Sequence, residues 1–482
     1  MSAQVIVTIG LETHVQLKSR TKIFCSCAAE FGSTPNSNVC PVCLGLPGSL
    51  PVLNRKVFSL GLRAVLALGG TPSEVIKFDR KNYFYPDLPK GYQISQFDHP
   101  LGRGGFVEID TPTGVKQVVL NRLHLEEDAG KLIHDNSPTE SHVDLNRAGT
   151  PLAEIVTEPC LDSSEEAYEY LTNLKAILKT AGVSDCDMEK GHLRCDANVS
   201  IRKNAADPLG TRVEIKNLNS FKAVKAAIEY EVKRQAEALE KGEVMVQETR
   251  LWDDTRQKTF TMRSKEDAHD YRYFPEPDLV PFHLEVSEIE EARKSLPTLP
   301  RARKENLMAK YNLSEYDARL ICADQEIENF FEDCVKIYND VKTIAIWIKG
   351  SVFAYRAENS DEFKKFGLSR LKPQLLVQLI GLVDAGTLSL QVAKEKVFPE
   401  IVRGFSPAQV VKEKGLTQVS DTGALEGWIV EVIAANPKVV EDFKSGKESA
   451  VMFLVGQVMK KSQGKANPGM LGELIKKKLK EI

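Results

Sequence analysis

The sequence predicts an α+β protein, in which a largely antiparallel sheet domain is followed by helices. Through residue 292, segments of alternating apolar and polar residues dominate, separated by Gly, Pro, Asn and Asp. Helices are expected over residues 164–181, where a Ser-Ser-Glu-Glu signal opens the helix, and over residues 220–241. After the prolines at 297 and 300, apolar residues recur at helical spacing.

These changes of pattern predict three domains, as does a length of 482 residues at ~150 residues per domain. We expect a sheet domain over residues 1–292, an all-helical domain over 293–405 and a helical tail over 406–482. All 8 histidines lie at or before position 283, which suggests that the chemistry resides in the first domain.

Composition narrows the class of protein. The formal net charge is −3, so the chain lacks the overall positive field of small nucleic-acid binders. No uninterrupted apolar run is long enough to cross a bilayer, and the N-terminal residues read as a strand, not as a signal peptide. A cytosolic protein without a membrane partner is therefore expected.

The final 34 positions carry a local basic bias, with seven lysines and two acidic residues from Ser449 to Ile482. One interpretation is a solvated helix face, and the other is a surface that follows the phosphates of RNA. The candidate tRNA-binding residues are Lys460, Lys461, Lys465, Lys476 and Lys477.

Four of the nine cysteines fall close together, at positions 25, 27, 40 and 43. A CxC pair and a CxxC pair joined by a turn-rich loop can surround a tetrahedral zinc, and four sulfur ligands predict a closed, structural site. The alternatives are buried free thiols or a redox CxxC. Redox use favours a helix start, whereas Cys43 precedes a loop-like Leu-Gly-Leu-Pro-Gly.

Several expected strands carry charged residues on one face. Residues i and i+2 share a face, which groups Glu12 with His14, and Glu126 with His124 and Arg122. Glu154 lies on a further strand, and Asp196 lies on the polar side of residues 192–202. Each polar face alone can simply be exposed to solvent. If these strands are neighbours in one sheet, however, their polar faces bring chemically active groups together.

Carboxylates gathered from Glu12, Glu126, Glu127 and Glu154 would repel one another, and a divalent cation would offset this repulsion. Carboxylate oxygens suit Mg²⁺. The basic residues expected nearby, as candidates for nucleotide binding, are Arg80, Lys81, Arg194, Arg202 and Lys216. Bound Mg²⁺ beside cationic side chains is what phosphoryl transfer requires.

No GxxxxGK[ST] loop occurs, and no GxGxxG opens a helix, so a nucleotide would bind without these phosphate-binding loops. The aromatic run Tyr83-Phe84-Tyr85 can stack on a base or can belong to the core beside a turn.

The same segments resemble the B-subunit family of the tRNA-dependent amidotransferases. The similarity extends along the chain and is carried by residues 9–17, 78–96, 123–131, 193–198, 270–278 and 453–457. Motifs of this length and unusual composition are more specific than short regular expressions.

The resemblance implies a catalytic cradle with some likeness to glutamine synthetase, a helical domain and a YqeY-like tail that contacts tRNA. It implies a complex with mischarged tRNA, with the glutaminase (amidase) or A component and with the small C component of a heterotrimer. A non-discriminating aminoacyl-tRNA synthetase is a further candidate partner. It also implies ATP, Mg²⁺ and structural zinc. The activity would be phosphorylation of tRNA-linked Glu or Asp, followed by displacement of the phosphate by ammonia that arrives through a tunnel.

Carried over by position, the resemblance assigns the metal and kinase site to Glu12, His14, Glu126, Glu127 and Glu154, with Arg80, Lys81 and Asp196 nearby. Magnesium is assigned to Glu12, His14, Glu126 and Glu154, and zinc to Cys25, Cys27, Cys40 and Cys43. Two alternatives differ in class. A non-catalytic tRNA-binding protein would tolerate Glu126→Gln, and a self-sufficient amide ligase would use glutamine without a partner.

Overall fold

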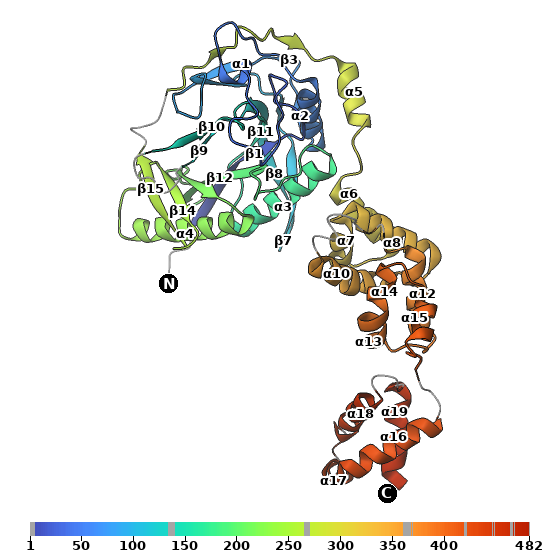
Figure 1. Ribbon diagram of the computed structural model, residues 1–482. Coiled ribbons are helices and arrows are strands. Elements are labelled where there is room, and N and C mark those ends of the chain that lie inside the picture. The colour runs from blue at the N-terminus through green and yellow to red at the C-terminus, as the bar shows by residue number, and fades with distance from the viewer. Residues whose placement is uncertain are drawn as a thin grey trace. The chain divides into compact units, whose positions relative to one another are not determined.

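The computed structural model describes residues 5–133, 140–264, 270–359, 368, 370–418, 422–445, 447, 449–462, 466 and 468–481. The chain divides into two compact units, Met1–Pro300 and Arg301–Ile482. The first unit is mixed α/β and the second is helical (Figure 1). The expected fold class of a mostly antiparallel sheet domain followed by helices is confirmed at this level.

A large sheet forms the centre of the first unit. Its neighbouring strands are antiparallel except for β13 and β14. In spatial order they are β15 (Lys258–Ser264), β14 (Glu248–Asp253), β13 (Val213–Leu218), β12 (Leu193–Arg202), β1 (Ile6–Gln16), β11 (Pro151–Thr157), β8 (Gly114–Glu127), β6 (Gly102–Arg103) and β2 (Thr71–Pro72), with β7 (Phe106–Thr111) paired to β8.

Shorter strands flank the large sheet. They are β16 (Phe274–Pro275), β4 (Asp79–Asn82) and β5 (Tyr92–Ser95) in one sheet, β9 (Lys131–Ile133) with β10 (His142–Asp144), and β3 (Val75–Ile76) with β17 (Phe282–His283). The helices of this unit are α1 (Pro41–Leu44), α2 (Arg55–Ala67), α3 (Ser164–Thr180), α4 (Phe221–Glu240) and α5 (Val286–Lys294).

Both long helices expected from the sequence are present, and serines start them. The Ser163 hydroxyl accepts a hydrogen bond from the Glu166 amide, and Ser220 does the same for Ala223. The helices lie side by side against the sheet (Figure 1). Their apolar faces pack with Leu11, Val15 and other inward residues in one core, so the apolar face of the sheet is covered.

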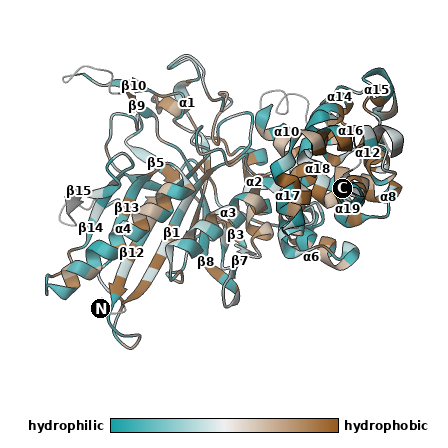
Figure 2. Cartoon of the chain, turned by 90° about the horizontal axis from the view of Figure 1, so that it is seen from below, coloured by the Kyte–Doolittle hydropathy of each residue, from teal (hydrophilic) through white to brown (hydrophobic). Residues whose placement is uncertain are grey.

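The second unit is built from short helices with apolar and polar stretches (Figure 2). They are α6 (Pro300–Tyr311), α7 (Glu315–Cys322), α8 (Gln325–Ile337), α9 (Val341–Trp347), the π-helix η2 (Ile348–Val352), α10 (Phe353–Glu358), α12 (Pro373–Asp384), α13 (Leu390–Val392), the π-helix η3 (Ala393–Val397), α14 (Phe398–Val402), α15 (Pro407–Glu413), α16 (Thr422–Ala435), α17 (Pro437–Lys444), α18 (Ser449–Lys461) and α19 (Pro468–Glu481).

The compact units differ from the domain bounds expected from the sequence. The first unit ends at Pro300, not at residue 292, because Leu296 and Leu299 still pack on the core of the sheet. α15 lies beyond the expected boundary after Phe405, yet its Val410 and Val411 belong to the apolar cluster of the preceding helices. A separate cluster holds α16 to α19 together. None of the described helices is long and apolar enough to cross a membrane.

We expect Leu125→Ala to destabilise the sheet by about 3 kcal/mol, since the fully buried side chain leaves a cavity beneath β8. Val119→Ala on the same strand is the matched control, because Val119 is 44% exposed and its truncation should change stability by about 0.5 kcal/mol or less. Chemical denaturation measures the stability of both variants, and amide hydrogen exchange in β1, β8 and β11 shows whether the sheet is affected. Equal losses of stability in the two variants would contradict the placement of the Leu125 side chain in the core.

Candidate functional site

The polar face of the large sheet carries a row of charged side chains. His14 on β1 lies opposite Glu154 on β11 and opposite Arg194 on β12, and Glu154 lies opposite His124 on β8. Opposite residues of antiparallel strands share a face. The row therefore crosses four strands that are far apart in the sequence.

Two imidazoles and two carboxylates meet in this row. Nε2 of His14 lies 3.5 Å from Oε1 of Glu126 and 3.4 Å from Oε2 of Glu154. Nε2 of His124 lies 3.7 Å from Oε2 of Glu126 and 3.3 Å from Oε2 of Glu154. One ligand atom from each of His14, Glu126 and Glu154 lies within 4.8 Å of the others, close enough to share a cation.

The pKa values reflect this mixture of charges. Burial lowers the pKa of His124, but Glu154 and Glu126 outweigh it and raise the value to about 9. Burial favours neutral carboxyls at Glu154 and Glu126, yet the two imidazoles hold both pKa values below the usual range. The cluster therefore favours its charged forms despite being buried.

A second acidic group lies beside the first. Glu12 faces Asp196 in the register of β1 and β12, and its Oε1 accepts a 2.9 Å hydrogen bond from Asn198. Burial, followed by repulsion from Glu154, Glu214 and Asp196, raises the pKa of Glu12. Nζ of Lys216 binds Asp196 at 2.7 Å and Glu214 at 2.9 Å. Negative charge at Glu12 is thus in excess, which a cation would relieve.

Both groups contribute to the lining of one cavity of about 410 Å³, whereas the buried Glu126 is not among its lining residues. Its other charged wall is Lys81 of β4, whose Nζ lies 4.8 Å from the centre of the Tyr271 ring. Burial lowers the pKa of Lys81, while Glu126 and other nearby groups raise it more strongly. The lining residues are Glu12, His14, Lys81, Gln96, Phe97, Arg122, His124, Glu154, Asp196, Glu214, Lys216, Tyr271 and Tyr273.

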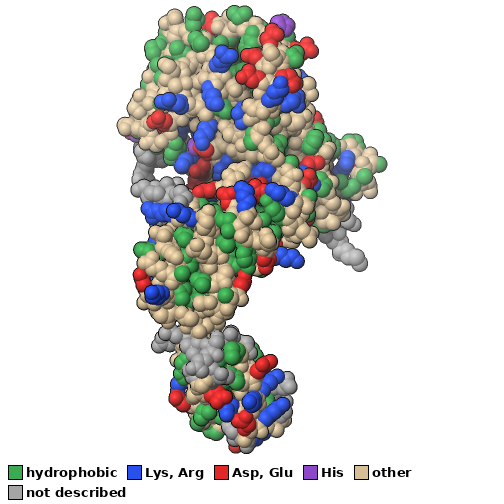
Figure 3. Space-filling model, turned by 90° about the vertical axis from the view of Figure 1, so that its right-hand side faces the viewer, with side chains coloured by type: hydrophobic (Ala, Val, Ile, Leu, Met, Phe, Trp, Pro, Cys, Tyr) green, Lys and Arg blue, Asp and Glu red, His purple; other side chains and the backbone are tan. Residues whose placement is uncertain are grey.

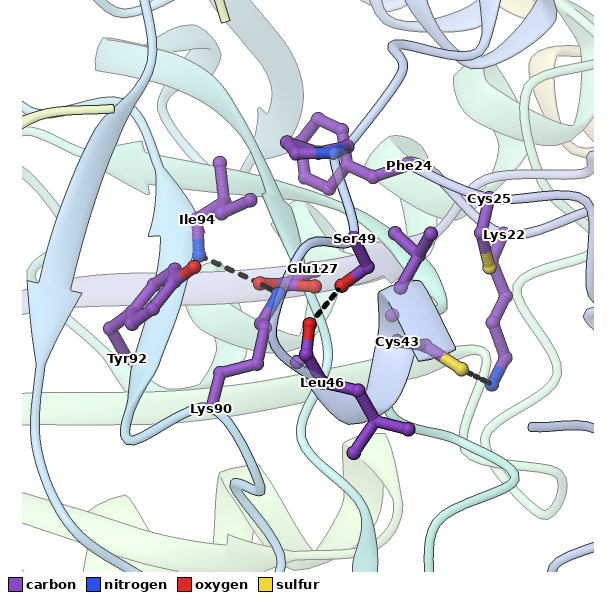
Figure 4. Close-up of a pocket in the computed structure, with 14 residues that line it drawn as sticks. Lys22, Phe24, Cys25, Cys43, Leu46, Ser49, Lys90, Tyr92, Ile94 and Glu127 are labelled. Carbon is purple, nitrogen blue, oxygen red and sulfur yellow. Dashed lines mark hydrogen bonds and ion pairs between the residues drawn. The ribbon is translucent and has the colours of Figure 1, made fainter. Parts of the chain in front are cut away.

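Glu127, which was expected to join this group, points elsewhere. Neighbouring strand residues face opposite sides, so Glu127 faces away from Glu126. Its carboxylate pairs with Lys90 and accepts a 2.8 Å hydrogen bond from the Ile94 amide (Figure 4). These groups line a different cavity, of about 160 Å³, that reaches Cys43.

Three of the basic residues expected at the site do not line the larger cavity. Arg80 faces away from its neighbour Lys81 and binds Glu276 through two hydrogen bonds of 2.7 and 2.8 Å. Arg194 belongs to the polar row but donates to Asp128 at 2.8 Å and does not line the cavity. Arg202 lies opposite Ile6 at the far end of β12 and donates to the Asp207 carbonyl, so it does not reach the cavity.

The four clustered cysteines converge, with one sulfur from each within 4.8 Å of the others. A hydrogen bond from Cys25, followed by lesser effects that include Lys22, lowers the pKa of Cys43 to about 4 despite burial. The loop expected after Cys43 is present, because the short helix α1 ends at Leu44 and Gly45 caps it in a left-handed conformation. Cys40 caps the start of this helix. A helix start alone would allow redox chemistry, but the meeting of all four thiols favours a metal site.

The basic residues of the tail are partly described. Lys460 and Lys461 end α18 and Lys476 and Lys477 lie on α19, all four exposed or partly exposed. Lys461 pairs with Glu431. Lys465 lies outside the described residues. Figure 3 shows acidic and basic side chains interspersed on the face in view.

Seven residues that line the cavity were not in the candidate site predicted from the sequence: Gln96, Phe97, Arg122, His124, Glu214, Tyr271 and Tyr273. His124 and Arg122 shared the polar face of Glu126, and this period-2 pattern was the signal for them. Tyr271 and Tyr273 come from a segment with no regular alternation, so only the structure brings them to the cavity.

The fold and this cavity define an enzyme domain of the α+β class, with a buried cluster of titratable groups suited to a cation. Two family profiles match the chain: one described as GatB/GatE catalytic domain over residues 7–290, and one described as GatB domain over residues 329–479. The chain belongs to the family of aspartyl/glutamyl-tRNA(Asn/Gln) amidotransferase B subunits.

Relatives that carry this name match along nearly the whole chain. The chain is 50% identical to the protein of Carboxydothermus hydrogenoformans over 478 residues, covering 98% of each. It is 51% identical to that of Thermoanaerobacter pseudethanolicus over 472 residues, again 98% of each. The protein of Persephonella marina is 50% identical over 474 residues, which are 98% of this chain and 99% of the relative.

We expect Arg80→Lys to loosen residues 270–278. The Glu276 side chain is fully buried, and lysine cannot reproduce the paired hydrogen bonds of the guanidinium. The local opening free energy should fall by about 1–2 kcal/mol, measured by amide hydrogen exchange. Arg55→Lys at the exposed start of α2 is the control. Unchanged exchange in residues 270–278 would show that this pair does not hold the segment.

Proposed function

We propose that this chain carries out the amidation step in which Glu or Asp attached to tRNA becomes Gln or Asn, with ATP and with ammonia from a partner protein. The name of its relatives supports the substrate. The observation that carries the proposal is the meeting of His14, Glu126 and Glu154, from three strands far apart in the sequence, beside the cavity that His14, Glu154 and Lys81 line.

The reaction needs two group transfers, because a carboxylate is a poor electrophile at neutral pH. First, a carboxylate oxygen of the aminoacyl group bonds to the γ-phosphorus of ATP, the bond to the bridging β–γ oxygen breaks, and ADP leaves. Ammonia then bonds to the activated carbonyl carbon, the carbon–oxygen bond to phosphate breaks, and inorganic phosphate leaves. The attacking nitrogen loses one proton to a base.

The cavity offers charge where the first transfer needs it. Glu12, His14, Glu126 and Glu154 would hold Mg²⁺, since carboxylate oxygens suit this ion and the ligand atoms of His14, Glu126 and Glu154 already lie close together. Bound Mg²⁺ supplies charge neutralisation to phosphate oxygens. Lys81, Lys216 and Arg122 border the same space and would orient the phosphates and the substrate carboxylate. Asp196 holds Lys216 in place.

The expected partners belong to the same proposal. The amidase (A) component would generate ammonia, the small C component would join it, and mischarged tRNA would contact the lysines of α18 and α19, with a non-discriminating synthetase as a further candidate. Glu127 and Lys90 border the smaller cavity and have no part in the proposed ATP site. A cradle like that of glutamine synthetase, a YqeY-like tail and a cytosolic location are parts of this proposal.

Glu126→Gln in the complex with both partner proteins should reduce amide formation and ADP release at least about 100-fold, because it removes charge from the cation and phosphate site. Binding of tRNA should be unchanged. Conversion of Glu-tRNA with labelled ATP measures the loss, and anisotropy of labelled tRNA measures binding. Glu243→Gln, at an exposed position after α4, is the control.

Two outcomes would overturn the proposal. Full activity of Glu126→Gln with intact tRNA binding would indicate a non-catalytic tRNA-binding protein. Robust glutamine use by the chain without its partners would indicate a self-sufficient ligase.

We also propose that the cysteines at 25, 27, 40 and 43 hold a structural zinc. Four thiolates around Zn²⁺ carry a net charge of −2, and the fully buried Lys22 places Nζ 3.6 Å from Sγ of Cys43. An isolated buried ammonium is strongly unfavourable, so this lysine fits an anionic sulfur cluster. The same Nζ donates to the Asn38 carbonyl at 2.7 Å.

Elemental analysis of the purified chain should find about one zinc per chain. Cys25→Ser and Cys40→Ser should each release most of it and lower the melting temperature, because a structural zinc site stabilises its fold. Cys160→Ser is the matched control, since Cys160 lies outside the cluster and should keep the metal. Zinc retained by the first two variants would show that the thiols are not its ligands.

A further inference from the structure

An aromatic pair stands at the cavity with the acidic cluster and belongs to neither the metal site nor the phosphate-orienting residues. The rings of Phe97 and Tyr273 are stacked, with centroids 4.2 Å apart and planes inclined by 13°. Both line the cavity that contains Glu12 and Glu154. Phe97 is nevertheless 58% exposed, so much of its ring faces solvent.

The backbone on the Phe97 side is fixed. Its amide donates a 3.0 Å hydrogen bond to Oδ2 of the buried Asp79. The preceding Gln96 is buried, accepts a 2.9 Å hydrogen bond from the Leu125 amide and donates to the Lys77 carbonyl at 3.1 Å. The exposed ring therefore stands on a segment anchored by both its own amide and the side chain before it.

The Tyr273 side is anchored to the same strand. The Asn82 amide donates to the Tyr271 carbonyl at 2.9 Å, and the Asn82 side chain donates to the Arg272 carbonyl at 2.7 Å. Phe274 then pairs with Arg80 in the register of β16 and β4. Arg272 has φ of +41°, a conformation that non-glycine residues adopt rarely. Such a feature, held by several hydrogen bonds, is typical of functional segments.

A lysine lies beside the aromatic residues of this cavity. Lys81 is on β4 between these anchors, and its Nζ lies 4.8 Å from the Tyr271 ring. Tyr271 and Tyr273 have ring centroids 6.1 Å apart. A stacked aromatic surface beside a lysine and a phosphate-transfer site matches the way proteins bind nucleotides without base-specific hydrogen bonds.

We propose that the Phe97–Tyr273 pair is a stacking platform for an adenine ring. The proposal rests on the proposed function, in which both substrates carry adenine: ATP in its base and tRNA in its 3′-terminal adenosine. Stacking on the free face of Phe97 would hold the base at the edge of the cavity while the reacting group reaches the acidic cluster. The platform selects a flat base, whereas the charged residues of the cavity bind the phosphate and the carboxylate.

The test uses the assembled complex and measures binding separately from turnover. Phe97→Ala and Tyr273→Ala should each weaken adenine binding about tenfold, the range measured for loss of one stacking partner. Phe97→Trp should restore it. Phe106→Ala is the control, because Phe106 is an exposed aromatic on β7 outside the cavity. Melting temperatures should match the wild type, which separates lost stacking from misfolding.

Two arms distinguish the source of the adenine. If ATP is the ligand, its dissociation constant rises in Phe97→Ala while tRNA binding is unchanged. If the tRNA end is the ligand, wild-type complex prefers tRNA ending in CCA over tRNA ending in CC, and Phe97→Ala loses this preference while ATP binding is unchanged. Either result supports the platform.

Affinities within twofold of wild type in both arms, for Phe97→Ala and for Tyr273→Ala, would overturn the platform and leave the amidation proposal intact. Failure of the wild-type complex to form amide would overturn the proposed function, and the binding arms would still report on stacking.

Discussion

The pairing of two imidazoles with two buried carboxylates across neighbouring strands is the interaction on which the site depends. His14 and His124 each lie within 4 Å of both Glu126 and Glu154. Uncompensated, these carboxylates would be strongly destabilising at such low exposure. A slip of one residue between β1 and β11 would exchange the two faces, burying charge in the core and exposing leucines. Register, core and site therefore support one another.

The floor and the edge of the cavity are held by different means. The floor is the charged row on β12, β1, β11 and β8. The backbone hydrogen bonds between these long central strands fix which side chains lie opposite one another. Short segments place the edge: the Asp79 carboxylate accepts a hydrogen bond from the Phe97 amide, the Asn82 side chain donates to the Arg272 carbonyl, and Arg80 pairs with Glu276. Small changes at β4 can thus alter the edge while the floor keeps its geometry.

Much of this was visible in the sequence. Alternation identified the faces of Glu12, His14, Glu126 and Asp196, start signals predicted both long helices, and cysteine spacing anticipated a four-sulfur cluster. Alternation is a local property, however, and cannot tell which strands are neighbours. Alternation places the neighbours Glu126 and Glu127 on opposite faces, but both were read as one acidic stretch, so Glu127 was grouped wrongly. Alternation could not place Arg202, which has the right face at the wrong end of its strand.

The position of β1 at the centre of the sheet has a consequence for biosynthesis. This strand is synthesised well before its partners β11 and β12, which lie at Pro151–Thr157 and Leu193–Arg202. At ~5–20 residues per second, the nascent chain waits on the order of ten seconds or more before both neighbours exist. An unpaired hydrophobic strand invites wrong pairing during that interval. Early protection of this segment by chaperones would therefore govern the yield of folded protein.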